Sequence, residues 1–324
     1  VCFFAMYVPF TYSMHRACIA AIGHDPEVKA WVRTRDLCGT LGNVRCDLVE
    51  ISNWSMSKEY KKAVVVSARV HPGESNASWM VHGLIGLLLA PGPEAQVLRN
   101  HFIWQIVPMV NPDGVICGNY RCGLCGVDLN RQWRRPSEAL HSTVYHLKRM
   151  IARSKRKLGL CMYVDLHGHS RKFGIFSYAC GQFPKEDYRR WTVRVWPKLL
   201  GMLVPEFSPG TCRWSVGKGK RGTGRVVVAK DLGLTDTYTI EASFFGAVVR
   251  KKPVSEAEKA KCPRGRSGGD LSGTTASSRA KLKEDQAGHA GTGGDEAVPH
   301  ARGQANGDPD HLQDDSDKDE EEIV

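Results

Sequence analysis

The 324-residue sequence predicts an α/β fold with a mixed, mostly parallel central sheet that helices cover on both faces. Two observations predict this class. Short runs of β-branched residues alternate along the chain with longer helical segments, as expected where crossover helices join parallel strands. The run Val64–Val66 and its neighbours show no apolar–polar alternation, which is typical of a strand buried on both faces.

Eight strands are expected, each a short apolar run bounded by turn residues. Pro72-Gly73 breaks the third strand, and Asn111-Pro112-Asp113-Gly114 is a turn sequence that stops the fourth. In chain order the predicted strands span residues 2–8, 46–52, 63–70, 102–110, 160–166, 173–178, 225–229 and 237–242.

Four helices are expected between these strands. Thr11 or Ser13 can cap the first and Ser75 or Asn76 the second, because their side-chain oxygens accept hydrogen bonds from free backbone N–H groups. Pro91-Gly92-Pro93 ends the second helix. The predicted helices span residues 15–22, 75–90, 137–153 and 184–203.

The composition divides the chain near residue 250. All 8 Trp, 10 Phe and 9 Tyr residues lie before residue 251. Residues 251–324 hold 11 Lys and Arg against 16 Asp and Glu, a net charge of −5, whereas residues 1–250 hold 34 against 18, or +16. A Gly- and Ser-rich segment without aromatic residues cannot bury a core. We therefore expect a basic folded domain over 11–250 and a disordered, acidic tail over 251–324.

Two histidines stand at strand ends and are each followed closely by glycine. His71 and Glu74 lie three residues apart on the break after the third strand, and His167 follows the fifth. If these strands are parallel neighbours, the three side chains meet at the rim where open α/β sheets bind ligands. Two His and one Glu, with a fourth position left for water, are the ligand set of a hydrolytic zinc site. The sequence therefore predicts one Zn²⁺.

Each histidine taken alone is a weak signal, because the chain contains 12 of them. The alternative for His167 is a hydrogen-bonded histidine at a sheet edge. Asp165 could orient its imidazole, whereas His169 should point away if the chain stays extended.

Three further residues carry charge or hydrogen-bonding groups in positions that suggest chemistry. Glu241 is the single acid in the last predicted strand, and a buried carboxylate needs a partner or a task such as general base. Asn130 and Arg131 stand side by side and could hold a carboxylate, Arg131 through its bidentate fork. The alternative for this pair is a surface arginine beside a turn asparagine.

Together these residues resemble the zinc metallocarboxypeptidase family, and within it the cytosolic carboxypeptidase (tubulin deglutamylase) branch. The stretches that carry the resemblance fall in order across roughly residues 60–245. They are His71-Pro72-Gly73-Glu74-Ser75, Asn111-Pro112-Asp113-Gly114-Val115, Gly118-Asn119-Tyr120-Arg121-Cys122, Val127-Asp128-Leu129-Asn130-Arg131, Asp165-Leu166-His167-Gly168-His169-Ser170, Gly222-Thr223-Gly224-Arg225 and Tyr238-Thr239-Ile240-Glu241-Ala242-Ser243-Phe244.

The resemblance implies a zinc exopeptidase with a zinc carboxypeptidase-like fold. It implies that His71, Glu74 and His167 hold Zn²⁺ and that Glu241 activates the attacking water. It further implies that Arg121 stabilises the oxyanion.

The same resemblance implies that Asn130 and Arg131 hold the terminal α-carboxylate of the substrate. In this branch the side-chain pocket is basic and the preferred terminal residue is glutamate. Lys218 and Arg225 are the candidates for that pocket, in a loop that also carries Lys220 and Arg221. For any one of these four cations, a solvated loop position is the alternative.

The expected substrates are acidic protein tails, such as polyglutamate chains or tubulin tails, in the cytoplasm and at the cytoskeleton. An odd count of 11 Cys without paired density favours reduced thiols. The apolar stretch Phe3–Val8 is too short to span a membrane. Nucleic acid would suit the charge of the front domain, but no recognised motif supports it. The oligomeric state is not predicted.

Two departures from the branch are expected at the ends of the domain. Residues 1–10 hold at most the last strand of the β domain that usually precedes the catalytic domain. After Phe245 the family continues with a packed helix, whereas here Lys251-Lys252-Pro253 opens the low-complexity stretch. These departures leave a catalytically impaired binder of acidic tails as one alternative. An aspartoacylase-type zinc deacylase is the other, because it also resembles this chain in a zinc site and an Asp-x-Asn-Arg stretch.

Overall fold

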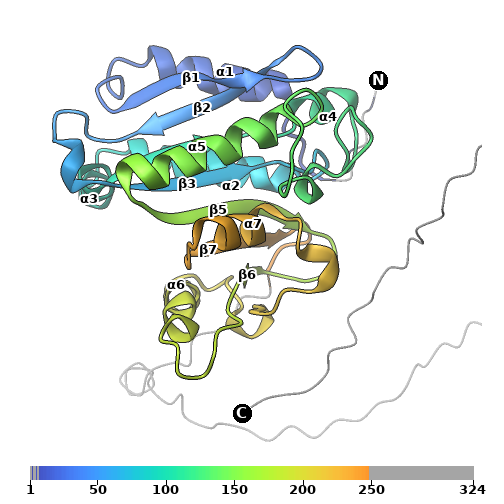
Figure 1. Ribbon diagram of the computed structural model, residues 1–324. Coiled ribbons are helices and arrows are strands. Elements are labelled where there is room, and N and C mark those ends of the chain that lie inside the picture. Colours follow the sequence, from blue (N-terminus) through green and yellow to red (C-terminus); the bar gives the residue numbers. More distant parts are fainter. Residues whose placement is uncertain (1, 3–4, 6, 248–324) are drawn as a thin grey trace, which may run out of the picture. The chain divides into compact units, whose positions relative to one another are not determined.

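The computed structural model of the chain describes residues 2, 5 and 7–247, and it contains a seven-stranded mixed sheet (Figure 1). The order across the sheet is β1-β2-β4-β3-β5-β7-β6. This confirms the predicted mixed α/β class. The strands are β1 (Val32–Gly39), β2 (Arg45–Ile51), β3 (Lys62–Ala68), β4 (Phe102–Val107), β5 (Leu160–His169), β6 (Ile175–Ala179) and β7 (Thr237–Ser243).

The four central strands are parallel, and the flanking strands are antiparallel. β3 pairs in parallel with both β4 and β5, and β5 pairs in parallel with β7. β1, β2 and β6 run antiparallel to their neighbours. The carboxyl ends of β3, β5 and β7 therefore lie side by side at one edge of the sheet, where side chains from distant parts of the sequence can meet.

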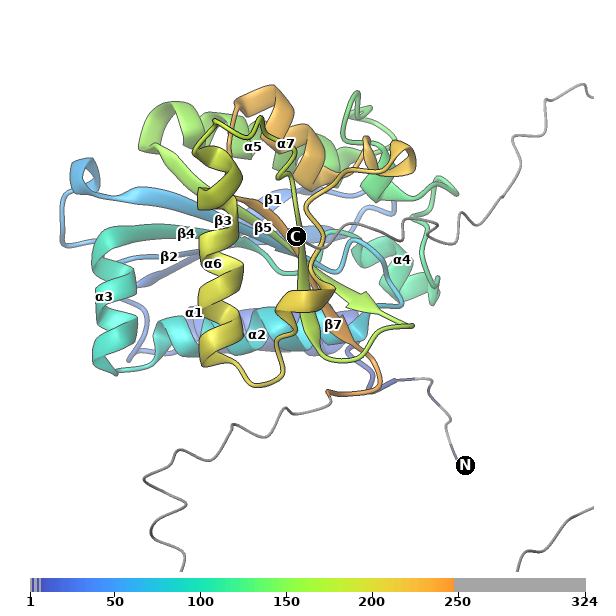
Figure 2. The same cartoon turned by 90° about the horizontal axis from the view of Figure 1, so that it is seen from below.

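Helices cover the sheet on both faces (Figure 2). One core contains apolar side chains from α1, α2 and α6, and the other contains side chains from α5 and α7. The helices are α1 (Tyr12–His24), α2 (Ser75–Leu89), α3 (Pro93–His101), α4 (Pro112–Cys117), α5 (Ser142–Leu158), α6 (Arg189–Leu203) and α7 (Gly224–Leu232). Single 3₁₀ turns are η1 (Lys58–Tyr60), η2 (Leu129–Arg131), η3 (Pro209–Thr211) and η4 (Lys218–Lys220).

The central strand β3 explains why its sequence lacks alternation. Val64 and Val66 pack into the core on the α2 face, and Ala63 and Val65 pack into the core on the α5 face. Each of these side chains is almost fully buried, which contributes roughly 1.5–3 kcal/mol for each valine. Both layers of helices are therefore anchored on one short run of residues.

The strand predicted over 225–229 is wrong, because these residues lie within α7. Val226, Val227 and Val228 favour a strand by their β-branched side chains. Here Val227 and Val228 are buried in the core shared with α5, and this packing outweighs the local preference.

Two predictions near the starts of elements also change. Residue Glu74 is the N-cap of α2, and Ser75 is the first helical residue rather than the cap. The Glu74 carboxylate makes no capping bond, because it is turned towards two imidazoles. Residues 2, 5, 7 and 8 are not part of a strand, and residues 3, 4 and 6 lie outside the described residues. The predicted tail over 251–324 lies outside them as well.

Candidate metal centre and active site

The loop after β3 places two of the predicted ligands. Arg69 adopts a positive φ of 57°, which turns the chain as β3 ends. Its buried guanidinium donates hydrogen bonds to the Pro72 carbonyl and to Ser78 Oγ, both at 2.8 Å. At Gly73 a Cβ would lie 2.8 Å from the Tyr120 carbonyl oxygen, so only glycine fits there without movement. These contacts fix His71 and Glu74 at the start of α2.

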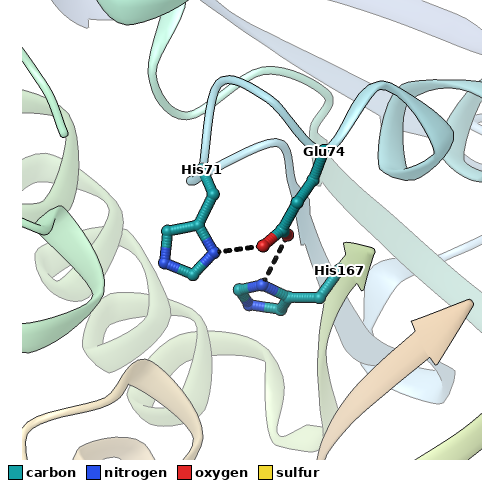
Figure 3. A group of neighbouring side chains, drawn as sticks. All are labelled: His71, Glu74 and His167. Atoms are coloured by element: carbon teal, nitrogen blue, oxygen red, sulfur yellow. Dashed lines mark hydrogen bonds and ion pairs between the residues drawn. The ribbon is translucent and has the colours of Figure 1, made fainter. Parts of the chain in front are cut away.

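His71, Glu74 and His167 converge from β5 and the β3–α2 loop (Figure 3). Glu74 Oε1 lies 2.6 Å from His71 Nδ1, and Oε2 lies 2.9 Å from His167 Nδ1. The Gly168 N–H also donates to Oε2, at 3.0 Å. All three side chains are buried, and one potential ligand atom from each lies within 4.8 Å of the others. The structure thus brings the predicted ligand set together.

The Nε2 atom of each imidazole lies next to a further carboxylate. His71 Nε2 lies 3.1 Å from Asp128 Oδ1, and His167 Nε2 lies 2.8 Å from Asp165 Oδ2. In metal sites a carboxylate on the outer ring nitrogen fixes the tautomer and orientation of a ligating histidine. Both Nδ1 atoms are therefore left to face the centre of the group.

The charges around the group favour a cation. Burial lowers the pKa of His167, but the Asp165 and Glu74 carboxylates outweigh it and raise the pKa well above the ordinary value. The pKa of His71 is likewise raised by Glu74 and Asp128 against the effect of burial. A divalent cation can supply the positive charge that these carboxylates favour. Two imidazole nitrogens and one carboxylate suit Zn²⁺, so the residues present fit the predicted zinc ion.

Glu241 is brought to the same edge by the next strand. β7 pairs in parallel with β5, and Glu241 lies in register with His167. Desolvation by the surrounding protein raises the pKa of Glu241 to about 7, and the Glu74 carboxylate adds to that rise. A carboxyl group with a pKa near neutrality can both accept and return a proton at physiological pH.

Asp128 forms ion pairs with both predicted arginines. Arg121 Nε and Nη2 lie 2.9 and 2.8 Å from Asp128 Oδ2, and Arg131 Nη1 lies 3.6 Å from the same oxygen. The Arg121 and Arg131 side chains stay 42% and 30% exposed, so their guanidinium groups can also reach a ligand.

Asn130, the residue before Arg131, is buried. Its Nδ2 lies 3.2 Å from His167 Nε2, and its Oδ1 accepts a hydrogen bond from the Gly224 N–H at 2.9 Å. Its amide, predicted to be part of the carboxylate clamp with Arg131, therefore ties β5 to the start of α7.

The four cations of the 218–225 segment differ sharply in environment. Arg225 is 5% exposed, and its Nε and Nη1 have no hydrogen-bond partner in the described part of the chain. Its pKa is lowered by burial, while Cys180 and Glu241 act in the opposite direction. Lys218, Lys220 and Arg221 are exposed in η4 and at its end. The pKa of Lys220 is lowered by desolvation and by the Arg131 and Arg121 charges, which places Lys220 by the site.

Some residues of the site could not be found from the sequence. The contact of Asp128 with His71 joins residues 57 apart, and Asp128 otherwise resembles a turn residue in front of η2. The Tyr7 ring stacks on Phe244, with ring centroids 3.7 Å apart, just past the end of β7. Neither pairing has a local signal, because each depends on how the strands are arranged.

The fold and part of the sequence are similar to those of zinc carboxypeptidases. Residues 30–173 match the family model described as zinc carboxypeptidase. A solved structure, a metallo-carboxypeptidase from Burkholderia cenocepacia, has the same fold with a TM-score of 0.64. It is 24% identical, and the match covers 73% of this chain and 61% of that one.

Within the family, the chain is similar to cytosolic carboxypeptidases. It is 40% identical to cytosolic carboxypeptidase 2 of Mus musculus over 256 residues, which are 78% of this chain and 29% of that protein. It is also 40% identical to cytosolic carboxypeptidase 1 of Gallus gallus over 272 residues, 76% of this chain and 22% of that protein. Residues 30–173 thus match the zinc carboxypeptidase family, and the chain spans less than a third of the length of these relatives.

Across residues 7–247, no helix combines the length and the apolar character that crossing a membrane requires.

Proposed function

We propose that the chain is a zinc-dependent carboxypeptidase that releases glutamate from acidic C-termini or from glutamate branches on protein tails. The observation that carries the acidic preference is Arg225, a buried guanidinium next to Glu241. Two of its nitrogens have no hydrogen-bond partner within residues 7–247. A buried charge without a partner is costly, and a substrate carboxylate would offset that cost. The names of the cytosolic relatives support peptidase activity and a cytosolic setting.

The residues around the site have distinct tasks in this proposal. His71, Glu74 and His167 would hold zinc, which when bound polarises water and the scissile carbonyl. Glu241 accepts a proton from the attacking water as the C–O bond forms, and passes it to the amine nitrogen as the C–N bond breaks. The pKa of Glu241, about 7, suits both transfers.

Three arginines would position and stabilise the substrate. Arg121 stabilises the negative charge that develops on the carbonyl oxygen. Arg131, next to Asn130 in the chain, holds the terminal α-carboxylate through its planar fork. Arg225 takes the side-chain carboxylate, so that a terminal glutamate satisfies the buried cation that a neutral residue would leave unpaired.

The charge of the chain supports acidic protein tails as the substrate class. Residues 1–250 carry a net charge of +16, and Lys220 adds a cation at the rim of the site. Such a surface attracts acidic tails and raises their rate of encounter. Tubulin tails are our candidate target, with main-chain and branch glutamates both open.

The direct test incubates the zinc-loaded protein with a peptide that ends in several glutamates and detects free glutamate by mass spectrometry. A matched peptide that ends in glutamine should be cut far more slowly, because it leaves Arg225 unpaired. A deacylase would instead cleave N-acyl amino acids and spare the peptide. Binding of the peptide by the folded protein without release of glutamate would favour the impaired binder.

A further inference from the structure

Gly73 and Gly168 each lie next to one of the predicted metal ligands, and each is covered by an aromatic ring. At Gly73 a Cβ would lie 2.6 Å from Cδ2 of Tyr120, and the Gly73 N–H donates to the Tyr120 carbonyl at 2.8 Å. At Gly168 a Cβ would lie 2.7 Å from Cζ of Phe244. Neither position leaves room for a side chain, so the two rings pack directly on the backbone beside the ligands.

Tyr7 contacts both of these aromatic side chains. Its ring stacks on Phe244, with ring centroids 3.7 Å apart and an angle of 12° between the planes. Desolvation raises the pKa of Tyr7, and the Tyr120 side chain raises it further, by its charge and through a hydrogen bond. We call Tyr120, Tyr7 and Phe244 the aromatic bridge, because they connect the loop over Gly73 with the end of β7.

The aromatic bridge joins two parts of the site that carry the proposed chemistry. Tyr120 directly precedes Arg121, the predicted oxyanion-stabilising residue, and Phe244 follows Glu241 by three residues at the end of β7. The Arg121 side chain is 42% exposed and is paired with Asp128. Because so much of this side chain is free of protein contacts, the packing of Tyr120 helps to fix where the guanidinium lies.

The segment that carries Tyr7 is anchored on α2. Phe10 is buried, and its ring contacts Trp79 edge-on and stacks on His82, with centroids 5.0 and 4.9 Å away. The Val8 carbonyl accepts a hydrogen bond from Trp79 Nε1 at 3.5 Å. This anchor and the stack on β7 together hold Tyr7 in place.

We propose that Tyr7 is a positioning residue, which acts through Tyr120 and sets the place of Arg121 relative to Glu241. This inference rests on the proposed function and adds to it a residue from the start of the chain. Tyr7 lies outside residues 30–173, which match the family model.

The expected effect of losing the aromatic bridge follows from how an oxyanion is stabilised. The donor must already point at the place where negative charge develops, and a shift of about 1 Å can cost about 10²-fold in rate. Arg131 and Arg225, which are proposed to bind the two substrate carboxylates, do not belong to the bridge. Its loss should therefore lower kcat and leave KM nearly unchanged.

The first test compares three single variants. Tyr7→Phe keeps the ring stack on Phe244 but removes the hydroxyl that meets Tyr120, and Tyr7→Ala removes both contacts. Tyr12→Phe is the matched control, because the Tyr12 hydroxyl donates to the Arg45 carbonyl at 3.2 Å instead. With a glutamate-ended peptide, kcat should fall about fivefold for Tyr7→Phe and about 100-fold for Tyr7→Ala, with KM within about twofold. Both constants of Tyr12→Phe should stay within about twofold, and a Tyr7→Ala kcat in that same range would overturn the proposal.

A double-variant cycle isolates the contact between the two phenols. Tyr120→Phe removes the other hydroxyl of the pair and should lower kcat as much as Tyr7→Phe does. The double variant should be no slower than either single variant, because its second substitution removes a contact that is already lost. Losses that multiply in the double variant would show that the two hydroxyls act independently, and would overturn the proposal.

A third measurement does not depend on catalysis. Trypsin cuts after Arg121 when this loop opens, and mass spectrometry gives the rate relative to cleavage after Lys29, an exposed residue before β1. Relative cleavage should rise about tenfold in Tyr7→Ala and stay within about twofold in Tyr12→Phe. If the wild type releases no glutamate, faster cleavage still supports the bridge while the proposed function fails. Unchanged cleavage in Tyr7→Ala, or faster cleavage with a normal kcat, would make Tyr7 at most a structural residue and overturn the proposal.

Discussion

The metal-ligand half of the site and its cationic half differ in how their polar atoms are satisfied. Around His71 and His167 every ring nitrogen lies within 3.1 Å of a carboxylate oxygen, and both Glu74 oxygens are engaged. In the cationic half, Arg225 is just as buried, but two of its nitrogens have no partner in the described residues.

This difference indicates which half depends on a ligand. The carboxylates of the metal-ligand half are paired with imidazoles whose pKa is raised. The fold can therefore form with protonated imidazoles, and a metal ion can then replace the protons. Arg225 cannot lower its cost by losing its proton, because a guanidinium stays charged in proteins. The Tyr178 ring, whose centroid lies 5.7 Å from the guanidinium carbon, and the Glu241 carboxylate offset part of that cost, and a bound anion would offset more of it. Mutations in the two halves should therefore have opposite effects on stability.

The largest effect is expected for His167→Ala. Loss of one of three ligands should reduce bound zinc from about one ion per chain to less than about a tenth, and abolish glutamate release. Zinc content by elemental analysis after dialysis checks this. His169→Ala is the matched control, because His169 Nδ1 accepts from the Arg171 and Lys172 backbone and lies outside the triad. Full zinc in His167→Ala would remove His167 from the ligand set.

Glu241→Gln should separate proton transfer from metal binding. The substitution keeps the shape of the side chain but removes the base, so kcat should fall by roughly 10²–10⁴. Zinc content should stay unchanged, because Glu241 lies outside the three-residue ligand group. Steady-state kinetics with a glutamate-ended peptide measures the first effect, and wild-type kcat in this variant would refute the assignment.

Arg225→Met tests the cationic half directly. The kcat/KM for a glutamate-ended peptide should fall about 100-fold, and that for a glutamine-ended peptide should change much less. The free energy of unfolding without substrate should not fall, and we expect a rise of about 1 kcal/mol, because an unpaired buried charge is replaced by an apolar chain. Urea unfolding and paired kinetics check both signs. A loss of stability with unchanged preference would make Arg225 a structural residue only.

Asp128→Asn tests the metal-ligand half, where we expect stability to fall rather than rise. The variant keeps a hydrogen-bonding group near His71 but loses the charge that also holds Arg121 and Arg131. Zinc affinity should fall by about tenfold or more, and stability by about 1–3 kcal/mol. Competition with a chelating dye measures the affinity. Unchanged affinity would show that Asp128 does not support the ligand His71.

The sequence predicted the parts of this site that have a local cause. His71 and His167 follow runs of buried residues, and parallel strands necessarily bring their carboxyl ends to one edge. The role of Asp128 was not predictable, because it arises when the loop before η2 folds over the strand ends. The difference between Lys218 and Arg225 was hidden for a related reason. Residues 225–229 resemble a strand, and only the packing of α7 turns Arg225 inward.

A strand at the edge of the sheet was also not predictable from the sequence. β1 was not predicted, because residues of Val32–Gly39 are mostly polar and exposed. Its backbone N–H and C=O groups pair with β2, but no run of apolar residues marks the strand in the sequence. Edge strands of this kind carry charged side chains that prevent further pairing, so their sequences resemble loops.

The smallest predicted effect concerns His82, a partly buried histidine of α2 outside the site. Its Nε2 has no partner within residues 7–247, and its ring stacks on Phe10 and faces His15, with centroids 4.9 and 5.8 Å away. Burial, and then His15, lowers the pKa of His82 from 6.5 to about 4. Between these values the unfolded chain binds a proton that the folded chain does not. Protonation therefore favours the unfolded chain. The free energy of unfolding is highest above pH 6.5 and falls as the pH drops towards 4.

We expect this loss to be roughly 1–2 kcal/mol, because the side chain keeps some contact with water. Urea unfolding of wild type and His82→Phe between pH 4 and 7 measures it, and the variant, which keeps an aromatic ring against Phe10, should show a flatter profile. Identical profiles would contradict the assignment. The result also sharpens the comparison with Arg225. A histidine without a partner can stay neutral at physiological pH and needs no ligand, whereas an arginine without a partner stays charged, so an orphaned buried guanidinium is the stronger sign of a binding site.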